Sequence, residues 1–305
     1  MPSPAVALFT YNRPRHTRAV LEALERCGVD HLYVFQDGLA ARHPTAPHRE
    51  VTELIAGIGF CPTTVARREK NAGLAASIIA GVTEVLREHE TIIVLEDDCV
   101  PAPQFLALMS ELLRRLATRE RVFSVSGYAL PAFPDDYPYD VCFAPLSSSW
   151  GWATWRDRWA KFDARAEGWP EVLKDRAQRL RFEAPGARFS TMLRMQMNGE
   201  VDSWAIRWYF TLFKHGGVCA WPLRSFIRNI GLDGSGTHTG KAPMLEAPGT
   251  GQLDLATLRI PPGLEFDPRI AAAFRNTWPG RTLGGTLRAL VRPSAWVSLA
   301  RRLAR

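Results

Sequence analysis

Three adjacent carboxylates end a wholly apolar run of the sequence. The stretch IIVLEDDCVPAP, residues 92–103, reaches Glu96, Asp97 and Asp98 directly after a core-type strand pattern. Like charges this close repel one another unless a positive group lies between them. Carboxylate oxygens at a strand end suit Mg²⁺ or Mn²⁺, which keeps several waters and bridges to a substrate diphosphate. The alternatives are a solvated acidic turn and an N-cap of the following helix, a role that Asp98 could partly take.

The elements that must position these acids alternate between strand and helix patterns. Short apolar runs predict strands, and longer segments with apolar residues at helical spacing predict helices between them. The predicted strands cover residues 5–11, 31–38, 63–69 and 91–98, and the predicted helices cover 15–28, 48–58 and 74–90. Four such repeats imply an α/β fold, in which a mostly parallel, doubly wound sheet has helices on both faces.

In a sheet of this kind, ligands bind beyond the carboxyl ends of the strands. Asn12 and Arg13 follow the first predicted strand, Asp37 follows the second, and the acidic run follows the fourth. This shared position favours a metal and ligand site over a solvated turn. The signal comes from position, since residue type alone would not separate the two.

Seven short motifs occur in a specific order along residues 4–240. They are TYNRP, VFQDG, KNAGLAASI, VLEDDCVPAP and SSWGWATW, followed by VDSW and SFIRNIGLDGSGTH. In this order they resemble GT-A-fold glycosyltransferases of the family 2 kind, and most of all the N-acetylglucosaminyltransferase I group. The resemblance implies a hexosyl- or N-acetylhexosaminyltransferase. Such an enzyme moves a sugar from a nucleoside-diphosphate sugar, most simply a UDP-sugar, to a hydroxyl of a glycan, glycolipid or glycoprotein.

The resemblance also implies a binding site for the nucleotide. It places Tyr11, Asn12 and Arg13 beside the nucleoside and Asp37 at the nucleobase. A uracil ring presents an imide N–H and carbonyls, which a carboxylate acceptor and an Arg donor complement. The local pattern leaves two alternatives open, namely that Arg13 is a surface residue and that Asp37 only precedes the turn at Gly38.

For the diphosphate, the resemblance divides the acidic run. Glu96 and Asp97 would contact the donor, and Asp98 would be the direct ligand of Mn²⁺ or Mg²⁺. The segment KNAGLAAS could bring Lys70 and backbone N–H groups near the nucleotide. The start of a helix with Asn71 as its cap is an equally good interpretation of that segment.

The second half of the chain contains a run of tryptophans that could meet the sugar. Trp150 and Trp152 flank Gly151 in a predicted loop, where an indole ring could stack on the C–H face of a sugar. In the family resembled, a Gly-Trp turn lies beside the donor sugar, which implies Trp152 as a donor contact. Trp155 and Trp159 are four residues apart and are predicted to be core residues on a helix.

Inverting transfer needs a carboxylate that removes the proton of the acceptor hydroxyl. Asp202 in NGEVDSWAIRWYF aligns with the base of the family resembled, and Glu200 is its competitor. The alternative is that Asp202 is the N-cap of the helix that follows. The sequence departs from the family pattern at Val201, where an aromatic residue is expected, and at Ser203, where an acid is expected. These departures leave the identity of the sugar open.

The segment RNIGLDGSGTH is rich in glycine and polar residues, which is typical of a mobile loop. We expect it to close over the diphosphate and to exclude water. His238 is the candidate second metal ligand by resemblance, and Arg228 and Ser235 are candidates for contacts with phosphate oxygens. A solvated loop histidine is the alternative for His238.

Charge is distributed unevenly along the chain. The net charge is +7, and seven Arg and no acid lie between residue 271 and the end. The remaining 31 Lys and Arg are matched by 31 acids, so the body is neutral, which argues against a nucleic-acid-binding body, because such a body should carry a basic face. We therefore expect no nucleic-acid partner.

The basic tail ends in TLRALVRPSAWVSLARRLAR, residues 286–305, in which apolar residues recur among the arginines. It could lie on an anionic membrane surface, as a basic amphipathic segment does. A helix docked on the body and a disordered end are the alternatives. The predicted organisation is a GT-A catalytic domain at 1–255 and a basic, helical C-terminal tail at 256–305. Within the domain, residues 1–100 would bind the nucleotide and 101–255 the sugar and acceptor.

We expect a cytoplasmic protein, with the inner face of the cell membrane as the place where the tail would make contact. The N-terminus has no signal-peptide pattern, no apolar stretch approaches the roughly 20 residues that span a bilayer, and five dispersed cysteines lack CxxC spacing. Two rival functions remain open. One is a sugar nucleotidyltransferase, disfavoured because TYNRPRHT has no glycine, and the other is a catalytically silent sugar-nucleotide or glycan-binding protein.

Overall fold

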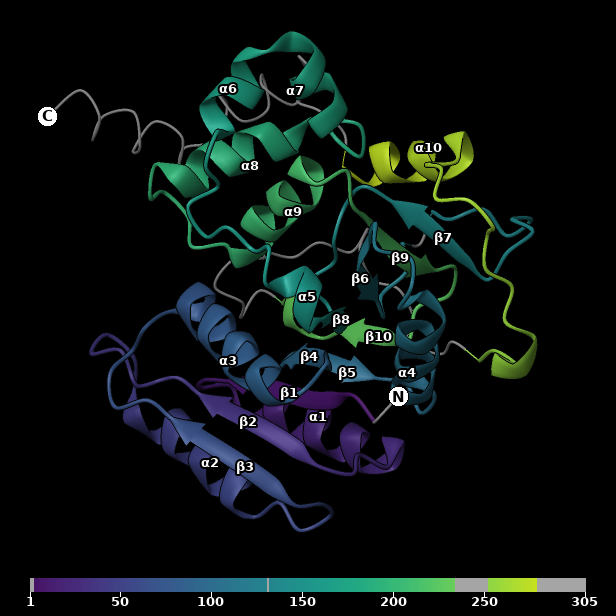
Figure 1. The fold of residues 1–305 in the computed structure, drawn as a ribbon. Helices are drawn as coiled ribbons and strands as arrows, with labels where there is room; N and C mark the ends of the chain where they lie inside the picture. The colour runs from purple at the N-terminus through teal and green to yellow at the C-terminus, as the bar shows by residue number, and fades with distance from the viewer. Residues whose placement is uncertain (1–2, 131, 234–251, 279–305) are drawn as a thin grey trace, which may run out of the picture.

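The computed structural model describes residues 3–130, 132–233 and 252–278. In this part of the chain, eight strands form one twisted sheet with the order β3-β2-β1-β4-β8-β6-β9-β7, and a separate pair is formed by β10 and β5 (Figure 1). The strands are β1 (Ala5–Thr10), β2 (Leu32–Gln36), β3 (Thr63–Arg67), β4 (Thr91–Glu96), β5 (Cys99–Pro101), β6 (Val122–Ser126), β7 (Val141–Ala144), β8 (Trp152–Trp155), β9 (Val218–Pro222) and β10 (Ile227–Asn229).

Helices cover both faces of this sheet. They are α1 (Pro14–Cys27), α2 (Thr45–Ala56), α3 (Leu74–Glu88), α4 (Phe105–Leu116), α5 (Arg156–Trp159), α6 (Trp169–Lys174), α7 (Arg176–Phe182), α8 (Arg188–Met197), α9 (Trp204–Lys214) and α10 (Pro268–Thr277). Two 3-10 turns lie at Gly231–Asp233 and Leu255–Thr257. The predicted α/β class, with a mostly parallel sheet between helices, is therefore confirmed.

The first four strands are parallel, as their sequence patterns predict. β1 pairs with β2 on one side and with β4 on the other, and β2 pairs with β3. β4 is apolar from Ile92 to Leu95, because both faces of this central strand are covered. Figure 1 shows α1 and α2 together on one face of the sheet and α3 on the other, which is the arrangement of a doubly wound fold.

The sheet continues without a break into the second half of the chain. β8 inserts between β4 and β6 and runs antiparallel to both. Side chains alternate across a strand, so Trp152 and Trp155 of β8 point to opposite faces. Trp155 donates a hydrogen bond from Nε1 to the carbonyl of Leu113 in α4, whereas Trp152 stacks on Trp204 of α9. Helices α4 and α9 therefore cover opposite faces of β8.

The prediction that Trp152 lies in a loop is wrong. The residue begins β8 and its side chain is fully buried. Its ring contacts those of Trp159, Trp204 and Trp208, which form one aromatic cluster between β8, α5 and α9. The prediction that Trp155 and Trp159 are core residues is confirmed, although only Trp159 is helical.

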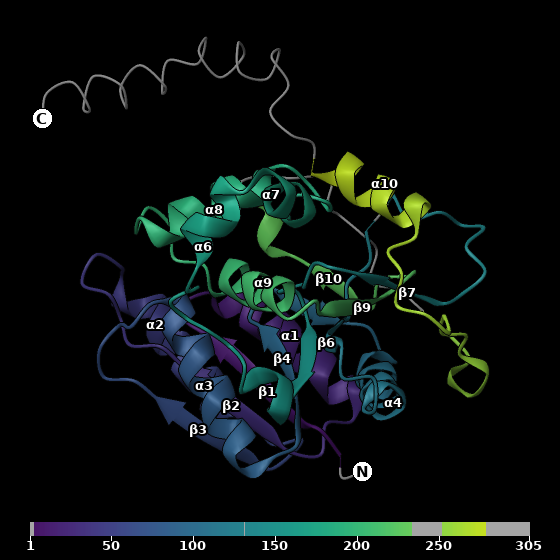
Figure 2. The same ribbon diagram turned by 45° about the horizontal axis from the view of Figure 1, so that its top comes forward.

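Residues 252–278 pack onto the body, although the sequence assigns most of them to the tail. The side chain of Gln104 exchanges two hydrogen bonds with the backbone of Leu253, and Arg115 of α4 donates to the carbonyl of Leu258. Phe274 of α10 is fully buried and meets the ring of Trp221 edge-on. Figure 2 shows α10 above β7 and β9. The rest of the predicted tail, residues 279–305, lies outside the described residues.

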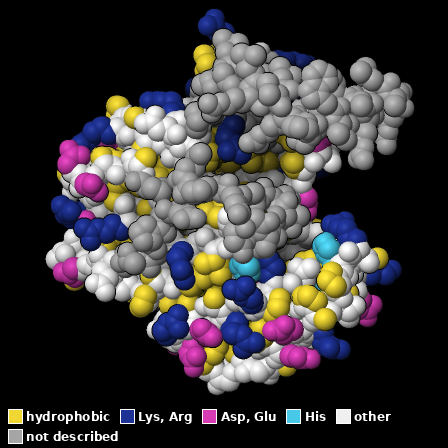
Figure 3. All heavy atoms as spheres, turned by 180° about the vertical axis from the view of Figure 1, so that it is seen from behind, with side chains coloured by type: hydrophobic (Ala, Val, Ile, Leu, Met, Phe, Trp, Pro, Cys, Tyr) yellow, Lys and Arg dark blue, Asp and Glu magenta, His cyan; other side chains and the backbone are white. Residues whose placement is uncertain are grey.

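The surface of the described part carries mixed charge. Figure 3 shows the face opposite to that of Figure 1, where Lys and Arg side chains alternate with Asp and Glu instead of forming a patch of one sign. None of the helices in the described ranges has the length and apolar composition needed to cross a bilayer. All five cysteines are described and all are free thiols.

Candidate functional site

The registers of the central strands bring the predicted site residues to one edge of the sheet. Thr10 at the end of β1 lies opposite Gln36 of β2, and Phe9 lies opposite Glu96 of β4. The residues that follow these three strands therefore leave the sheet side by side. As predicted, the segment that begins at Tyr11, the turn at Asp37 and the acidic run share the carboxyl edge.

Arg13 is the positive group that lies between the adjacent carboxylates. Its Nη2 donates to Oδ1 of Asp97 and, over 2.9 Å, to Oδ2 of Asp98. Pro14 starts α1 immediately after Arg13, and its fixed backbone angle suits the first helical position. The start of α1 thus holds the backbone of Arg13 at the edge, so that its side chain reaches both acids.

The ionisation of this cluster reflects its burial. Burial lowers the pKa of Arg13, and Asp97 and Asp98 raise it by more, so its pKa rises overall and the guanidinium stays charged. The pKa of Glu96 is raised to about 8 as the net result of several causes. Desolvation is the largest and raises it, Asp98 and Asp97 also raise it, and Arg13 and a hydrogen bond from Trp204 lower it. This rise favours the neutral form of Glu96. This relieves part of the repulsion within the acidic run.

The cluster can take a divalent cation only together with other ligands. In the described residues, no group of three or more His, Cys, Asp or Glu side chains converges as a metal site. Oδ2 of Asp97 is buried without a hydrogen-bond partner there, and Asp98 shares its Oδ2 with Arg13. A Mg²⁺ or Mn²⁺ ion bound through one or two carboxylates plus phosphate oxygens and waters fits this donor set. An ion held by protein side chains alone does not.

Asp37 binds the chain itself. Its carboxylate accepts hydrogen bonds from the backbone N–H groups of Gly38, Ala72 and Gly73 and from Nδ2 of Asn71, at 2.9 to 3.2 Å. A carboxylate offers about four acceptor positions, and these four donors fill them. We therefore correct the assignment of Asp37 to the nucleobase, because in this arrangement it holds the loop at 70–73 instead.

The loop at 70–73 also explains why residue 38 is glycine. A Cβ atom at Gly38 would collide with the backbone of Lys70 and Asn71. Lys70 itself is exposed at this edge. The interpretation of the segment as a helix start is confirmed for α3, which begins at Leu74, but Asn71 bonds to Asp37 and Gly38 and does not cap the helix.

Replacement of Asp37 by Ala is expected to lower the free energy of unfolding by at least about 2 kcal/mol, because hydrogen bonds to a charged acceptor contribute about 1.5–3 kcal/mol each. Urea denaturation measures the change. Asp30→Ala, at an exposed position, is the control and should change stability by less than about 0.5 kcal/mol. A loss for Asp37→Ala as small as that of the control would contradict the assignment.

Asp202 lies at the N-terminus of α3, although it precedes α9 in the sequence. Its Oδ2 accepts a 3.2 Å hydrogen bond from the backbone N–H of Ala75, and its Oδ1 lies 4.0 Å from Nη2 of Arg207, beyond hydrogen-bond distance. The N-cap of α9 is Ser203, whose Oγ accepts from the N–H of Ile206. The alternative role for Asp202, as the cap of α9, is therefore wrong.

Asp202 also has the accessibility that a base requires. Its side chain is 51% exposed, so a substrate hydroxyl can reach it. Glu200, its competitor, is exposed in the preceding turn and accepts a hydrogen bond from Asn198. Asp202 is tied to α3 and so to the sheet edge, whereas Glu200 is tied to its own turn.

Trp152 has a positioning role in place of the predicted contact with the donor sugar. Its ring stacks on that of Trp204 with 4.7 Å between centroids, and Trp204 hydrogen-bonds Glu96. The buried tryptophan cluster thus sets the start of α9 against the end of β4. This places Asp202, two residues before Trp204, beside the carboxyl edge.

Three further predicted residues have defined places. The hydroxyl of Tyr11 lies 2.7 Å from Nδ1 of His43 and accepts from the N–H of Ala40, so it anchors the loop after β2. Asn12 is half-buried beside it. Arg228 is exposed on β10, where it pairs with Val100 just after the acidic run.

The glycine-rich segment that follows β10 starts at the acidic run. The N–H of Ile230 donates to the carbonyl of Asp98, and a Cβ atom at Gly231 would collide with the carboxylate of Asp98. Ser235 and His238 lie outside the described residues, as does the remainder of the predicted closing loop.

The structure adds two residues that the sequence analysis did not select. His16 lies near enough to Asp97 to lower the pKa of that carboxyl, against the larger rise caused by burial. Its place three residues after Arg13, on the first turn of α1, is a sequence signal that it shares the same helix face. Trp204 reaches Glu96 from the other half of the chain, and no local pattern indicates that contact.

Comparisons with known proteins give distant structural likenesses. No model of a protein family matches the sequence, and a search of curated proteins found no match. Over 56% of its length the chain is similar to the mannosyltransferase PcManGT from Pyrobaculum calidifontis, in complex with GDP-Man and Mn²⁺, with 14% identity and a TM-score of 0.33. The likeness spans 46% of that chain, less than half of its length.

A second likeness is to 4-diphosphocytidyl-2C-methyl-D-erythritol synthase from Anaerococcus prevotii. It covers 57% of this chain and 78% of that chain, with 7% identity and a TM-score of 0.34. At these TM-scores neither likeness assigns a substrate or a metal to the protein.

Proposed function

We propose that the protein is an inverting glycosyltransferase that takes its sugar from a nucleoside-diphosphate sugar, with a UDP-sugar as the first candidate. The observation that carries this proposal is the convergence of Asp202 and the Arg13–Asp97–Asp98 cluster on one edge of the sheet. The segment that links them is the loop at 70–73 with the first turn of α3, because Asp37 binds the N–H groups of Ala72 and Gly73 and Asp202 binds the N–H of Ala75. A cation-capable phosphate site and an accessible carboxylate thus lie along the same edge.

The proposed reaction follows from these groups. The acceptor hydroxyl gives its proton to Oδ1 of Asp202 while its oxygen forms a bond to the anomeric carbon of the sugar. The bond between that carbon and the diphosphate oxygen breaks, and the nucleoside diphosphate leaves with the electron pair. Attack from the side opposite the leaving group inverts the anomeric centre.

The departing diphosphate needs positive charge. Arg13, already at the acidic cluster, and Arg228 on β10 are the described candidates, and His16 is a third. Asp98, with Asp97, would hold a Mn²⁺ or Mg²⁺ ion bound together with the diphosphate, and the ion would supply charge stabilisation for the leaving group. Lys70, Tyr11 and Asn12 are proposed to line the nucleotide. All of these residues are selected by one criterion, their proximity to the carboxyl edge of the sheet.

A thermal-shift panel of nucleoside diphosphates and sugar nucleotides, with and without Mn²⁺, tests the proposal. A nucleotide at 100 times its Kd stabilises the folded state by about 2.7 kcal/mol, which corresponds to a rise in Tm of about 5 °C. The rise should require Mn²⁺ and should be lost in Asp98→Asn. If no nucleotide raises Tm in either condition, the protein does not use a nucleotide donor.

A nucleotidyltransferase is the main rival, and one observation disfavours it. Such an enzyme wants a glycine-rich basic loop after the first strand, whereas here Tyr11, Asn12 and Arg13 lead directly into α1 at Pro14. The two reactions differ in their products, because a nucleotidyltransferase releases pyrophosphate from a nucleoside triphosphate. Pyrophosphate release with a sugar phosphate and a nucleoside triphosphate would favour the rival.

A further inference from the structure

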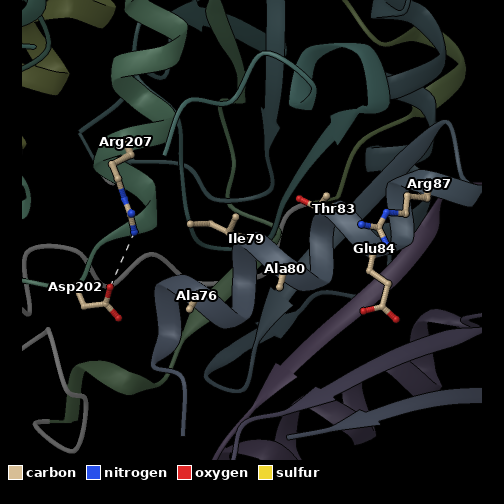
Figure 4. Close-up of a pocket in the computed structure, with 8 residues that line it drawn as sticks. All are labelled: Ala76, Ile79, Ala80, Thr83, Glu84, Arg87, Asp202 and Arg207. Atoms are coloured by element: carbon tan, nitrogen blue, oxygen red, sulfur yellow. Dashed lines mark ion pairs between the residues drawn. The ribbon is translucent and has the colours of Figure 1, made fainter. Parts of the chain in front are cut away.

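An open groove extends from Asp202 along the outer face of α3. It has a volume of about 700 Å³ and is lined by Ala76, Ile79, Ala80, Thr83, Glu84, Arg87, Asp202 and Arg207. Figure 4 shows Asp202 and Arg207 at one end of the groove, Ala76, Ile79 and Ala80 along α3, and Glu84 and Arg87 at the other end. From Ala76 to Arg87 the helix rises about 16 Å at 1.5 Å per residue.

The groove has a smooth floor and a polar rim. Ala76 and Ala80 present only methyl groups and are exposed, so no long side chain from these two positions fills the floor. Each end carries one acid and one arginine, Asp202 with Arg207 and Glu84 with Arg87. The charges of the lining therefore cancel at each end of the groove.

These features select one kind of occupant. A polyanion would meet one carboxylate and one arginine at each end of the groove, so the lining offers it no net attraction. An acyl chain would leave charged side chains at both ends without water or a partner, which is costly. A neutral polyhydroxyl chain suits both ends of the groove, because carboxylates accept hydrogen bonds from hydroxyl groups and guanidinium groups donate hydrogen bonds to them. Its C–H faces can lie on the methyl groups of the floor.

We propose that this groove binds the neutral oligosaccharide part of the acceptor, with its terminal hydroxyl at Asp202 and the remaining sugars along α3. The proposal rests on the proposed function, since Asp202 is the base only in a glycosyltransferase. It adds the acceptor subsite and the class of acceptor, which the site at the sheet edge does not specify.

The proposal can be tested by substitutions that fill the groove with a large side chain. Ala80→Trp and Ala76→Trp place a large ring on the floor at exposed helical positions, where the cost in helix propensity is below about 0.7 kcal/mol. Ala56→Trp, at the exposed end of α2, is the matched control. Neither Ala76 nor Ala80 contacts the Arg13 cluster, so donor binding should survive all three changes.

The experiment measures binding of three probe sets to the full chain in the presence of UDP and Mn²⁺. The sets are short neutral oligosaccharides, uronic-acid oligosaccharides, and alkyl chains without a sugar. We expect neutral oligosaccharides to bind, and we expect both groove variants to weaken their binding at least about tenfold, or 1.4 kcal/mol. Ala56→Trp should bind as the unchanged protein does.

Three results would overturn the inference: no bound neutral oligosaccharide, binding of the charged or alkyl probes alone, or neutral-oligosaccharide binding that both groove variants retain. Donor binding by thermal shift is measured on the same samples. If donor binding is also absent, the proposed function fails. If donor binding is intact and the groove variants have no effect, only the acceptor subsite fails.

Discussion

Replacement of Asp202 by Asn is expected to lower kcat by about 10²- to 10⁴-fold, the usual contribution of a general base. Asn keeps the shape and retains an oxygen that can accept from the N–H of Ala75, so α3 keeps its partner at the N-terminus. The lost property is the ability to take a proton at Oδ1. We therefore expect Tm to change little and the nucleotide-induced rise in Tm to persist. Initial-rate kinetics of sugar transfer measure the effect.

Glu200→Gln is the matched control for this change, because Glu200 lies two residues away and its carboxylate accepts a hydrogen bond from Asn198 in its own turn. It should transfer sugar at nearly the normal rate. If Glu200→Gln lowers kcat and Asp202→Asn transfers sugar at nearly the normal rate, Glu200 is the base. If both transfer at the normal rate, no carboxylate in this turn takes the proton, and the proposed mechanism is wrong.

Replacement of Arg13 by Met is expected to cost about 3–5 kcal/mol of folding free energy, as removal of one partner from a buried ion pair does. Asp97 is 4% exposed and Asp98 is 9% exposed, so neither carboxylate can regain full hydration when the guanidinium is lost. Met is similar in length and retains much of the aliphatic packing. Urea denaturation of the nucleotide-free protein measures the change.

The surface variant Arg18→Met is the control for the loss of an arginine. Arg18 lies 3.6 Å from Glu50, and both side chains are more than half exposed, so its removal should cost about 1 kcal/mol or less. Adding Asp97→Asn to Arg13→Met should restore part of the lost stability, because it removes a charge that has no partner. A loss for Arg13→Met no larger than that of the control would mean that Arg13 does not neutralise the buried acids.

The two expected effects separate two tasks at the sheet edge. Arg13 is needed for the fold to tolerate adjacent buried acids, so its loss is predicted to be visible without substrate. Asp202 is half-exposed and is the proposed proton acceptor, so its loss is predicted to be visible only in turnover. A single edge thus combines a buried, charge-balanced cluster with an accessible carboxylate.

Local patterns in the sequence were sufficient for the four parallel strands and the three helices between them, within residues 5–98. Apolar runs such as that of β4 predict buried strands because side chains alternate along a strand and both faces of a central strand are covered. The order of strands and helices then places Arg13, Asp37 and the acidic run at one edge, since the carboxyl ends of parallel strands face the same way. The sequence by itself therefore determined where chemistry is possible.

Only the tertiary structure decided which groups meet there. Arg13 pairs with an acid 84 residues away, and Asp202 bonds to an N–H group 127 residues away. The resemblance implied that Asp37 contacts a base, and the local pattern predicted that Trp152 lies in a loop, but Asp37 holds the loop at 70–73 and Trp152 lies buried in β8. The physical reason is that a carboxylate or an indole ring takes whichever partners the packed chain brings within a few ångströms. Periodicity records the exposure of a residue along its own element, and it carries no information about donors and rings that arrive from distant segments.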